Sequence, residues 1–258
     1  MNNRNTFIDL FRIVAIMLIV IDHTFFMLGF NNLHDLGIVM GYIGVSIFFF
    51  LSGYLTKIKT SSKDFIIDKL IKLYPIYFVA MIGTLLTSEA VIYPYCEIIY
   101  TFLLQVFYPH TSKILWFMSG LMMAYILYAV RNINSKWFII LASIFFIEWC
   151  YIGNFRMHLM IILFFLGNYL SNYKILEFNW KPNKIINAVG SSTLVIYLFH
   201  VLMLTGLYLI TMEPFWVYSV FIPIVIVSSV IIQKQYDKFT NWLKKQVRNK
   251  KQLKETFI

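Results

Sequence analysis

Nine apolar stretches follow one another along this chain, and few charged residues interrupt them. They cover residues 7–30, 38–56, 73–88, 91–107, 114–130, 137–153, 157–171, 187–211 and 215–233. A helix needs roughly 20 apolar residues to cross a membrane, so most of these stretches can form a span. Only 13% of the 258 residues are charged, about half the share in an average soluble domain. The pattern predicts an all-α, polytopic membrane helix bundle and excludes a free cytosolic enzyme.

The basic residues indicate how these stretches cross, because cytoplasmic loops carry an excess of Lys and Arg. If all nine crossed from a cytoplasmic N-terminus, every basic residue from Arg131 onward except Arg156 would lie outside. If residues 91–107 instead enter and return, only Lys113 and Arg156 lie outside. We therefore predict about eight spans plus one re-entrant or interfacial segment, with both termini cytoplasmic.

The same charges argue against nucleic acid as a partner. The formal net charge is +10, which we attribute to basic loops facing the anionic lipid of the bilayer.

We predict one transmembrane domain over residues 1–233 and a basic cytoplasmic tail over residues 234–258. Cys96 and Cys150 lie in separate apolar stretches, and we assign them no disulfide. No His, Cys or carboxylate cluster has the spacing of a metal site, so no metal is predicted.

Ionisable residues gather in the first apolar stretch, where they are costly and therefore indicate function. His23 follows Arg12 by eleven residues, which is about three turns and roughly 16 Å along a helix, so both lie on one face. Asp9 precedes Arg12 by three residues and can pair with it. These residues predict a polar track through the membrane. The alternative is a His23 that is hydrogen-bonded for structural reasons alone.

Two more groups of polar residues have both a structural and a functional interpretation. Lys69 and Lys72 share a helix face at the predicted cytoplasmic surface. They either bind a phosphorylated ligand or only anchor the loop. His200 lies inside the stretch 187–211, and a packing role and a functional role are equally open for it.

Four blocks of residues stand out in order along the chain. Arg12 and His23 are separated by ten residues, and a second block reads Gly-Val-Ser-Ile-Phe-Phe-Phe-Leu-Ser-Gly-Tyr over residues 44–54. The third is Lys69-x2-Lys72-x2-Pro75, and the fourth pairs Leu115-Trp116 through Tyr125 with Ser192-Thr193-x3-Tyr197-Leu-x-His200. Together these blocks resemble the motifs of the integral-membrane acyltransferases called the acyltransferase 3 family, with lysine in place of both arginines of the third motif.

The resemblance implies an O-acyltransferase of the bacterial cytoplasmic (inner) membrane. Such an enzyme moves an acyl group, usually acetyl, from a cytoplasmic acyl-CoA donor such as acetyl-CoA to a hydroxyl of a cell-surface or lipid-linked saccharide. The implied catalytic residues are His23, as base or acyl carrier, together with Arg12 and Asp9 on the same helix. The implied donor-binding residues are Arg12, Lys69 and Lys72. The implied substrate-binding residues are Ser52, Trp116, Tyr125, Tyr197 and His200.

Acyl transfer to a hydroxyl gives a chemical reason for a histidine in the membrane. A hydroxyl is a poor nucleophile at neutral pH, and a group that titrates near neutrality can take its proton. Direct transfer with His23 as base and transfer through an acylated His23 both stay open. The alternative function is a transporter or flippase that uses the same polar track for a polar or saccharide substrate. A membrane sensor whose histidines only pack is a further alternative.

Overall fold

The computed structural model describes residues 5–27, 34–59, 61–87, 116–152, 155–178, 180–181, 183–200 and 216–256. The regular structure in these ranges is helical, without strands, which confirms the all-α prediction for the described part of the chain. The predicted re-entrant segment 91–107 lies outside these ranges. The number of spans and the side on which the termini lie stay predictions.

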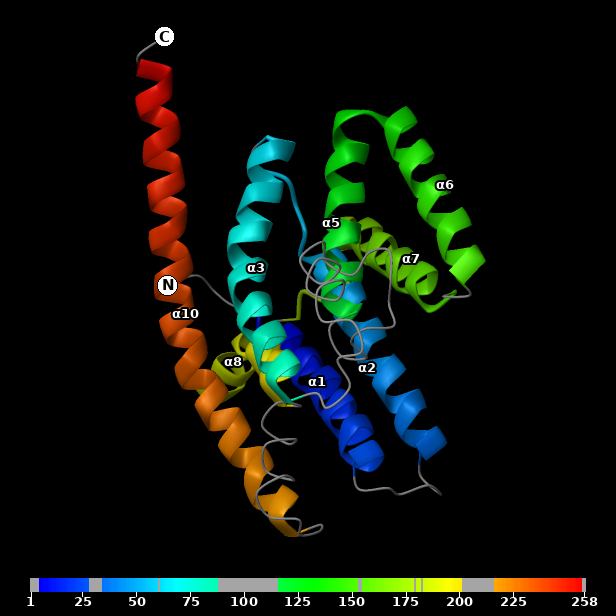
Figure 1. Ribbon diagram of the computed structural model, residues 1–258, viewed down its shortest axis with the longest axis vertical. Helices are drawn as coiled ribbons and strands as arrows, with labels where there is room; N and C mark the ends of the chain where they lie inside the picture. The colour runs from blue at the N-terminus through cyan, green and yellow to red at the C-terminus, as the bar shows by residue number, and fades with distance from the viewer. Residues whose placement is uncertain are drawn as a thin grey trace.

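Figure 1 shows how the helices are arranged. Their bounds are α1 Thr6–Met27, α2 His34–Tyr54, α3 Ser62–Thr87, α5 Trp116–Ile133, α6 Ser135–Ile152, α7 Phe155–Leu170, α8 Lys184–Ser191 and α10 Trp216–Thr256, with a 3-10 turn η2 at Ser171–Tyr173. Residues 193–200 form a further helical stretch directly after α8.

Helices α1 and α2 lie side by side because glycines of α2 face α1. A side chain at Gly44 would collide with the backbone oxygen of Ala15, and one at Gly41 would collide with the carboxylate of Asp22. Small residues let two helix backbones approach closely inside a membrane. The helix that carries the predicted polar track is therefore held along α2.

Helices α2 and α7 cross at a point where each contributes a glycine. A Cβ at Gly53 would lie on the backbone oxygen of Phe164 in α7, and a Cβ at Gly167 would lie on the backbone oxygen of Phe50 in α2. The two backbones thus touch directly, as at other small-residue crossings. This crossing positions α2, and with it α1, against the second half of the bundle.

The short helix α8 brings the chain back against α1. Asn183 begins it, since its side-chain oxygen accepts a hydrogen bond from the backbone N–H of Ile185 over 2.9 Å and so satisfies one of the free donors of the first turn. At the other end Gly190 is buried against Asp9, where any side chain would collide. The helical residues 193–200 follow and place His200 beside α1.

Helix α3 packs against α5 on one side and α10 on the other. Figure 1 shows α10 beside α3, with its C-terminal end extending beyond the rest of the bundle. The predicted last span and the predicted tail are one continuous helix of 41 residues. Lys244 and Arg248 in its tail part lie 3.7 Å and 3.5 Å from the carboxylate of Asp68 on α3, so the tail contacts the bundle.

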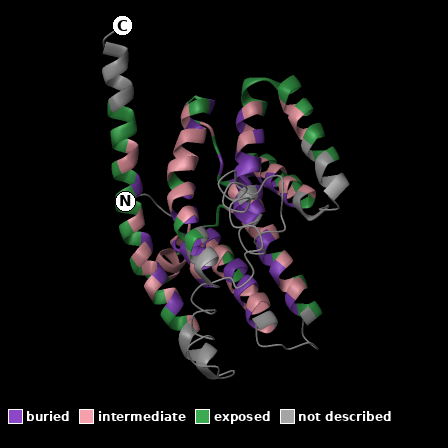
Figure 2. Ribbon diagram, in the orientation of Figure 1, coloured by how far each residue is buried: buried purple, intermediate pink, exposed green. Residues whose placement is uncertain are grey.

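Some described helices have the apolar character that a bilayer requires. Residues Asp35–Tyr54 form a helix that is long and apolar enough to cross a membrane, and Gly120–Ile133 and Ser135–Ile144 are apolar but shorter. Figure 2 shows exposed residues along α6. Ile139 and Ile147 of this helix are 61% and 68% exposed. A continuous apolar face of this kind indicates contact with lipid or protein rather than water.

Candidate active site

Two histidines from distant parts of the chain meet between α1 and residues 193–200. His23 Nδ1 lies 3.2 Å from His200 Nε2, and the ring centroids are 5.0 Å apart. His200 is fully buried and His23 is partly buried. The sequence predicted a role for His23, and the family resemblance implied one for His200, but their contact was not predicted, because the two lie 177 positions apart.

The backbone carbonyl oxygens near the two histidines indicate which ring nitrogens carry a hydrogen. His200 Nδ1 lies 3.0 Å from the carbonyl oxygen of Ile196 and 2.7 Å from that of Tyr197. Carbonyl oxygens only accept, so this nitrogen carries the hydrogen, and the Nε2 of a neutral His200 has the lone pair. His23 Nδ1 therefore donates to it, and also lies 3.0 Å from the carbonyl oxygen of Ile19. His23 Nε2 is left with a lone pair, which is what a base or nucleophile needs.

Asp9 and Arg12 pair on α1, as their spacing predicts. Arg12 Nη1 donates to Asp9 Oδ1 over 3.2 Å. Asp9 is buried at 1% exposure, whereas the Arg12 side chain is 27% exposed. The guanidinium thus extends from a buried carboxylate toward the surface of the bundle, about three helical turns from His23.

Lys69 contacts aromatic rings of α3 and α5. Its Nζ lies 4.0 Å from the ring centroid of Tyr125 and 5.2 Å from that of Phe65. A cation over an aromatic face is attracted by the negative charge density of the ring. The structure therefore brings together a predicted donor-binding lysine and a predicted substrate-binding tyrosine.

Lys72 lies in a cluster of cations at one end of the bundle. Desolvation by the surrounding protein lowers the pKa of Lys72 to about 8. Neighbouring positive charges act in the same direction: Lys69, Arg12 and Lys244. The three predicted donor-binding residues thus share one region, and α10 adds Lys244 to it.

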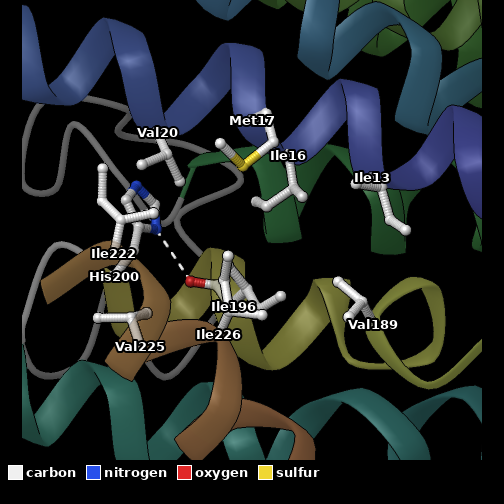
Figure 3. A pocket seen from close by; sticks show the side chains of 10 residues that line it. All are labelled: Ile13, Ile16, Met17, Val20, Val189, Ile196, His200, Ile222, Val225 and Ile226. Atoms are coloured by element: carbon white, nitrogen blue, oxygen red, sulfur yellow. Dashed lines mark hydrogen bonds between the residues drawn. The ribbon is translucent and has the colours of Figure 1, made fainter. Parts of the chain in front are cut away.

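An apolar cavity of about 30 Å³ adjoins the histidine pair. Figure 3 shows that α1, the helical residues around 189–200 and α10 enclose it. Its lining side chains are aliphatic or Met except for His200. In Figure 3 His200 and Val20 lie at one end of the cavity, and Ile13 and Val189 at the other.

Comparison with known protein families decides the class of this chain. A family model described as an acyltransferase domain matches residues 5–178, more than half of the sequence. The chain belongs to the acyltransferase 3 family. It is therefore an acyltransferase, and this membership favours the acyltransferase interpretation of the sequence over the transporter interpretation. No curated protein and no solved structure matches it.

The second motif of this acyltransferase holds helices together. Ser52 is partly buried, and its carbonyl oxygen accepts a hydrogen bond from Thr56 Oγ1 over 2.6 Å. Tyr54 Oη accepts one from the backbone N–H of Leu176 over 3.1 Å. With the glycine crossing of α2 and α7, these contacts fix the C-terminal end of α2. Substrate binding by Ser52 stays a prediction.

Two other predicted substrate-binding residues of the acyltransferase are buried. Tyr125 is 6% exposed and Tyr197 is 2% exposed, the latter with its ring centroid 4.7 Å from that of Phe117. Trp116 begins α5, and its side chain lies outside the described part. Roles for all three in acceptor binding stay predictions. In the ranges described, no three His, Cys, Asp or Glu residues are grouped so as to hold a metal ion.

The contribution of α10 to the acyltransferase site was not predicted from the sequence. Ile222, Val225 and Ile226 line the cavity, and Lys244 joins the cation cluster. The spacing of the first three, i, i+3 and i+4, is typical of a buried helix face. From the sequence, this spacing predicted only that residues 215–233 form a span. An apolar helix face does not indicate which other helix it packs against.

Proposed function

We propose that the protein is a membrane-embedded O-acyltransferase that moves an acetyl group from cytoplasmic acetyl-CoA to a hydroxyl of a cell-surface or lipid-linked saccharide. The observation that carries this proposal is the contact between His23 and His200. It leaves a lone pair on His23 Nε2 and holds the other ring nitrogen in place. This is the arrangement expected of a histidine that moves a proton during acyl transfer.

In direct transfer, His23 Nε2 takes the proton of the acceptor hydroxyl while the hydroxyl oxygen attacks the thioester carbon. The C–S bond then breaks, CoA leaves as a thiolate, and the proton passes from Nε2 to the sulfur. While His23 carries two protons, its Nδ1–H donates to His200 Nε2, which stabilises the imidazolium. The same lone pair can attack the thioester itself and form an acyl-imidazole, so both routes stay open.

The donor is proposed to enter at the end of α1 that carries Arg12. The phosphates of CoA are anionic, and Lys72 and Lys244 extend this cationic region onto α3 and α10. His23 follows Arg12 by eleven positions, roughly 16 Å of helix. The flexible pantetheine arm of CoA would bridge that interval and present the thioester to the histidines.

A contact between α3 and α5 supports the proposed topology. Asn132 Nδ2 at the end of α5 donates to Ser62 Oγ at the start of α3 over 3.3 Å. Since α3 leads away from this end of the bundle and α5 leads back to it, the two helices run in opposite directions, as the proposed topology requires. The tail contact with Asp68 on α3 adds support for a cytoplasmic C-terminus.

Three parts of the proposal rest on the family resemblance: the acetyl donor, the saccharide acceptor and the bacterial inner membrane. A saccharide hydroxyl is not ionised at neutral pH, which agrees with the need for a base. The apolar outer face of α6 agrees with a location in lipid.

The proposal is tested by the transfer of radiolabelled acetyl from acetyl-CoA into surface glycan, in membranes that carry the full chain. His23→Ala should lower the rate by about 10²–10⁴-fold, because the group that takes the proton is lost. His158→Gln is the control, since His158 lies on α7 with its Nε2 3.2 Å from the Phe146 carbonyl oxygen, and it should keep the wild-type rate. Equal labelling by wild type and His23→Ala, at matched protein levels, would remove His23 from the chemistry.

A further inference from the structure

The apolar cavity lies along α1, and His200 of the histidine pair lines one end of it. Ile13, next to Arg12 in the sequence, lines one end, and Val20 and His200 line the other (Figure 3). Val20 follows Ile13 by seven positions of helix, roughly 10 Å. The cavity therefore lies beside the path that connects the proposed donor phosphates with His23.

The chemistry of the lining excludes most groups of the proposed substrates. Apart from His200, whose Nδ1 is held by two carbonyl oxygens, the side chains around the cavity offer no polar group. The amides of pantetheine or the hydroxyls of a sugar would lose their hydrogen bonds with water and find few replacements, which is costly. Water is disfavoured for the same reason, and a hydrocarbon group is favoured.

The size of the cavity limits the length of that hydrocarbon. The cavity measures about 30 Å³, and one water-sized group needs roughly 10–15 Å³ on the same measure. There is thus room for about two or three non-hydrogen atoms. A long fatty acyl chain does not fit without movement of the surrounding helices.

We propose that this cavity holds the hydrocarbon part of the donor's acyl group and limits it to acetyl or propionyl, an inference that rests on the proposed function. The carbonyl of the thioester would then lie at the histidine end, next to His200 and its partner His23. Met17 from α1 and Ile226 from α10 line opposite sides, and they set the limit on chain length. Ile226 lies outside the region that the family model matches.

The test compares butyryl-CoA with acetyl-CoA as competing donors for the full-length protein in membranes. Wild type should prefer acetyl. Ile226→Ala removes three carbon atoms from the cavity wall and should raise the butyryl-to-acetyl ratio by about 10-fold or more, since each methylene that a pocket can or cannot accommodate changes selectivity by that order. Ile224→Ala is the matched control: Ile224 is in the same helix but 49% exposed, and its substitution should leave the ratio unchanged.

A second pair of variants on α1 keeps the test independent of how well one mutant of α10 folds. Met17→Ala should raise the same ratio, and Val14→Ala, at a residue that is 46% exposed, should not. An unchanged ratio in both cavity variants, with acetyl transfer still measurable, would overturn the cavity assignment and leave the proposed function standing. Equal use of butyryl and acetyl by wild type would overturn the size limit. Transfer from no acyl-CoA by wild type would overturn the proposed function, and the inference with it.

Discussion

At the residue scale, a neutral group, His200, supports the proposed base His23. A carboxylate hydrogen-bonded to His23 Nδ1 would stabilise the imidazolium more strongly than a neutral imidazole, but an ionised carboxylate is expensive to bury among apolar helices. The Nε2 of His200 accepts the same hydrogen bond without a charge. His200 itself is oriented by the carbonyl oxygens of Ile196 and Tyr197, so the tautomer of His23 is fixed by the backbone of another helix.

This arrangement predicts how His200 variants behave. His200→Leu removes the hydrogen-bond acceptor of His23 and should lower kcat by about 10²-fold. This loss is no larger than the loss of kcat expected when His23 itself is replaced. The KM for acetyl-CoA should change little, because the cations of the donor end are untouched. His200→Gln restores an acceptor oxygen and should recover part of kcat. Steady-state acetyl transfer measures both constants, and equal kcat values for the Leu and Gln variants would show that His200 only packs.

The two polar pairs of α1 differ in how far the sequence predicts them. Asp9 and Arg12 are three residues apart, and a helix places such residues on one face, so their ion pair follows from local spacing. His23 and His200 meet only because Gly190 lets α8 approach Asp9 and the next helical stretch lies along α1. That contact depends on the packing of helices, which no local pattern contains.

At the scale of the helices, direct backbone contacts hold the bundle together. Hydrophobic burial does not drive helices together in lipid, so close packing between small residues takes over part of that role. The crossing of α2 and α7 at Gly53 and Gly167 is such a contact. It fixes α2, along which α1 and its histidine lie.

Gly167→Ala should therefore destabilise the protein. The added methyl group would collide with the backbone oxygen of Phe50. A backbone atom of a packed helix cannot move away from the methyl group as the end of a flexible side chain could. Overpacking of this kind costs about 1–3 kcal/mol. Thermal unfolding in detergent measures the loss. Leu166→Ala, at a neighbouring residue that is 42% exposed, should shift the midpoint much less, and equal shifts would argue against a special role for the crossing.

The helices themselves were largely predictable, and their boundaries less so. Apolar stretches predicted α1 and α2 well, because continuous apolar sequence is the strongest signal a membrane helix gives. The change from apolar to basic sequence at Lys234 predicted the end of a span but not that one helix continues to Thr256. Helix propensity changes little at that boundary, since Lys, Gln and Leu all favour helix.

At the scale of the whole molecule, three basic regions gather at one end of the bundle. The start of α3 touches the end of α5 through Ser62 and Asn132, and the tail of α10 touches Asp68 on α3. Such a distribution agrees with the excess of basic residues on the cytoplasmic side of membrane proteins. The count of about eight spans rather than nine stays a prediction from the charges of the sequence.

Cysteine labelling tests this topology. In a chain with Cys96 and Cys150 replaced by Ser, Asn134→Cys should react with a membrane-impermeant maleimide only after the cells are permeabilised. Lys113→Cys, on the predicted outer side, should react in intact cells. Labelling of Asn134→Cys in intact cells would mean that the 91–107 segment crosses the membrane.

The position of His200 and α10 after the matched region 5–178 has a consequence for engineering. The residues that would bind the donor phosphates lie largely before that boundary, whereas His200, the partner of the proposed base, and one wall of the cavity lie after it. A chimera joined near η2 would thus combine the base of one enzyme with the orienting histidine and acyl limit of another. Recombination at this junction offers a way to change the transferred group while the donor end is inherited intact.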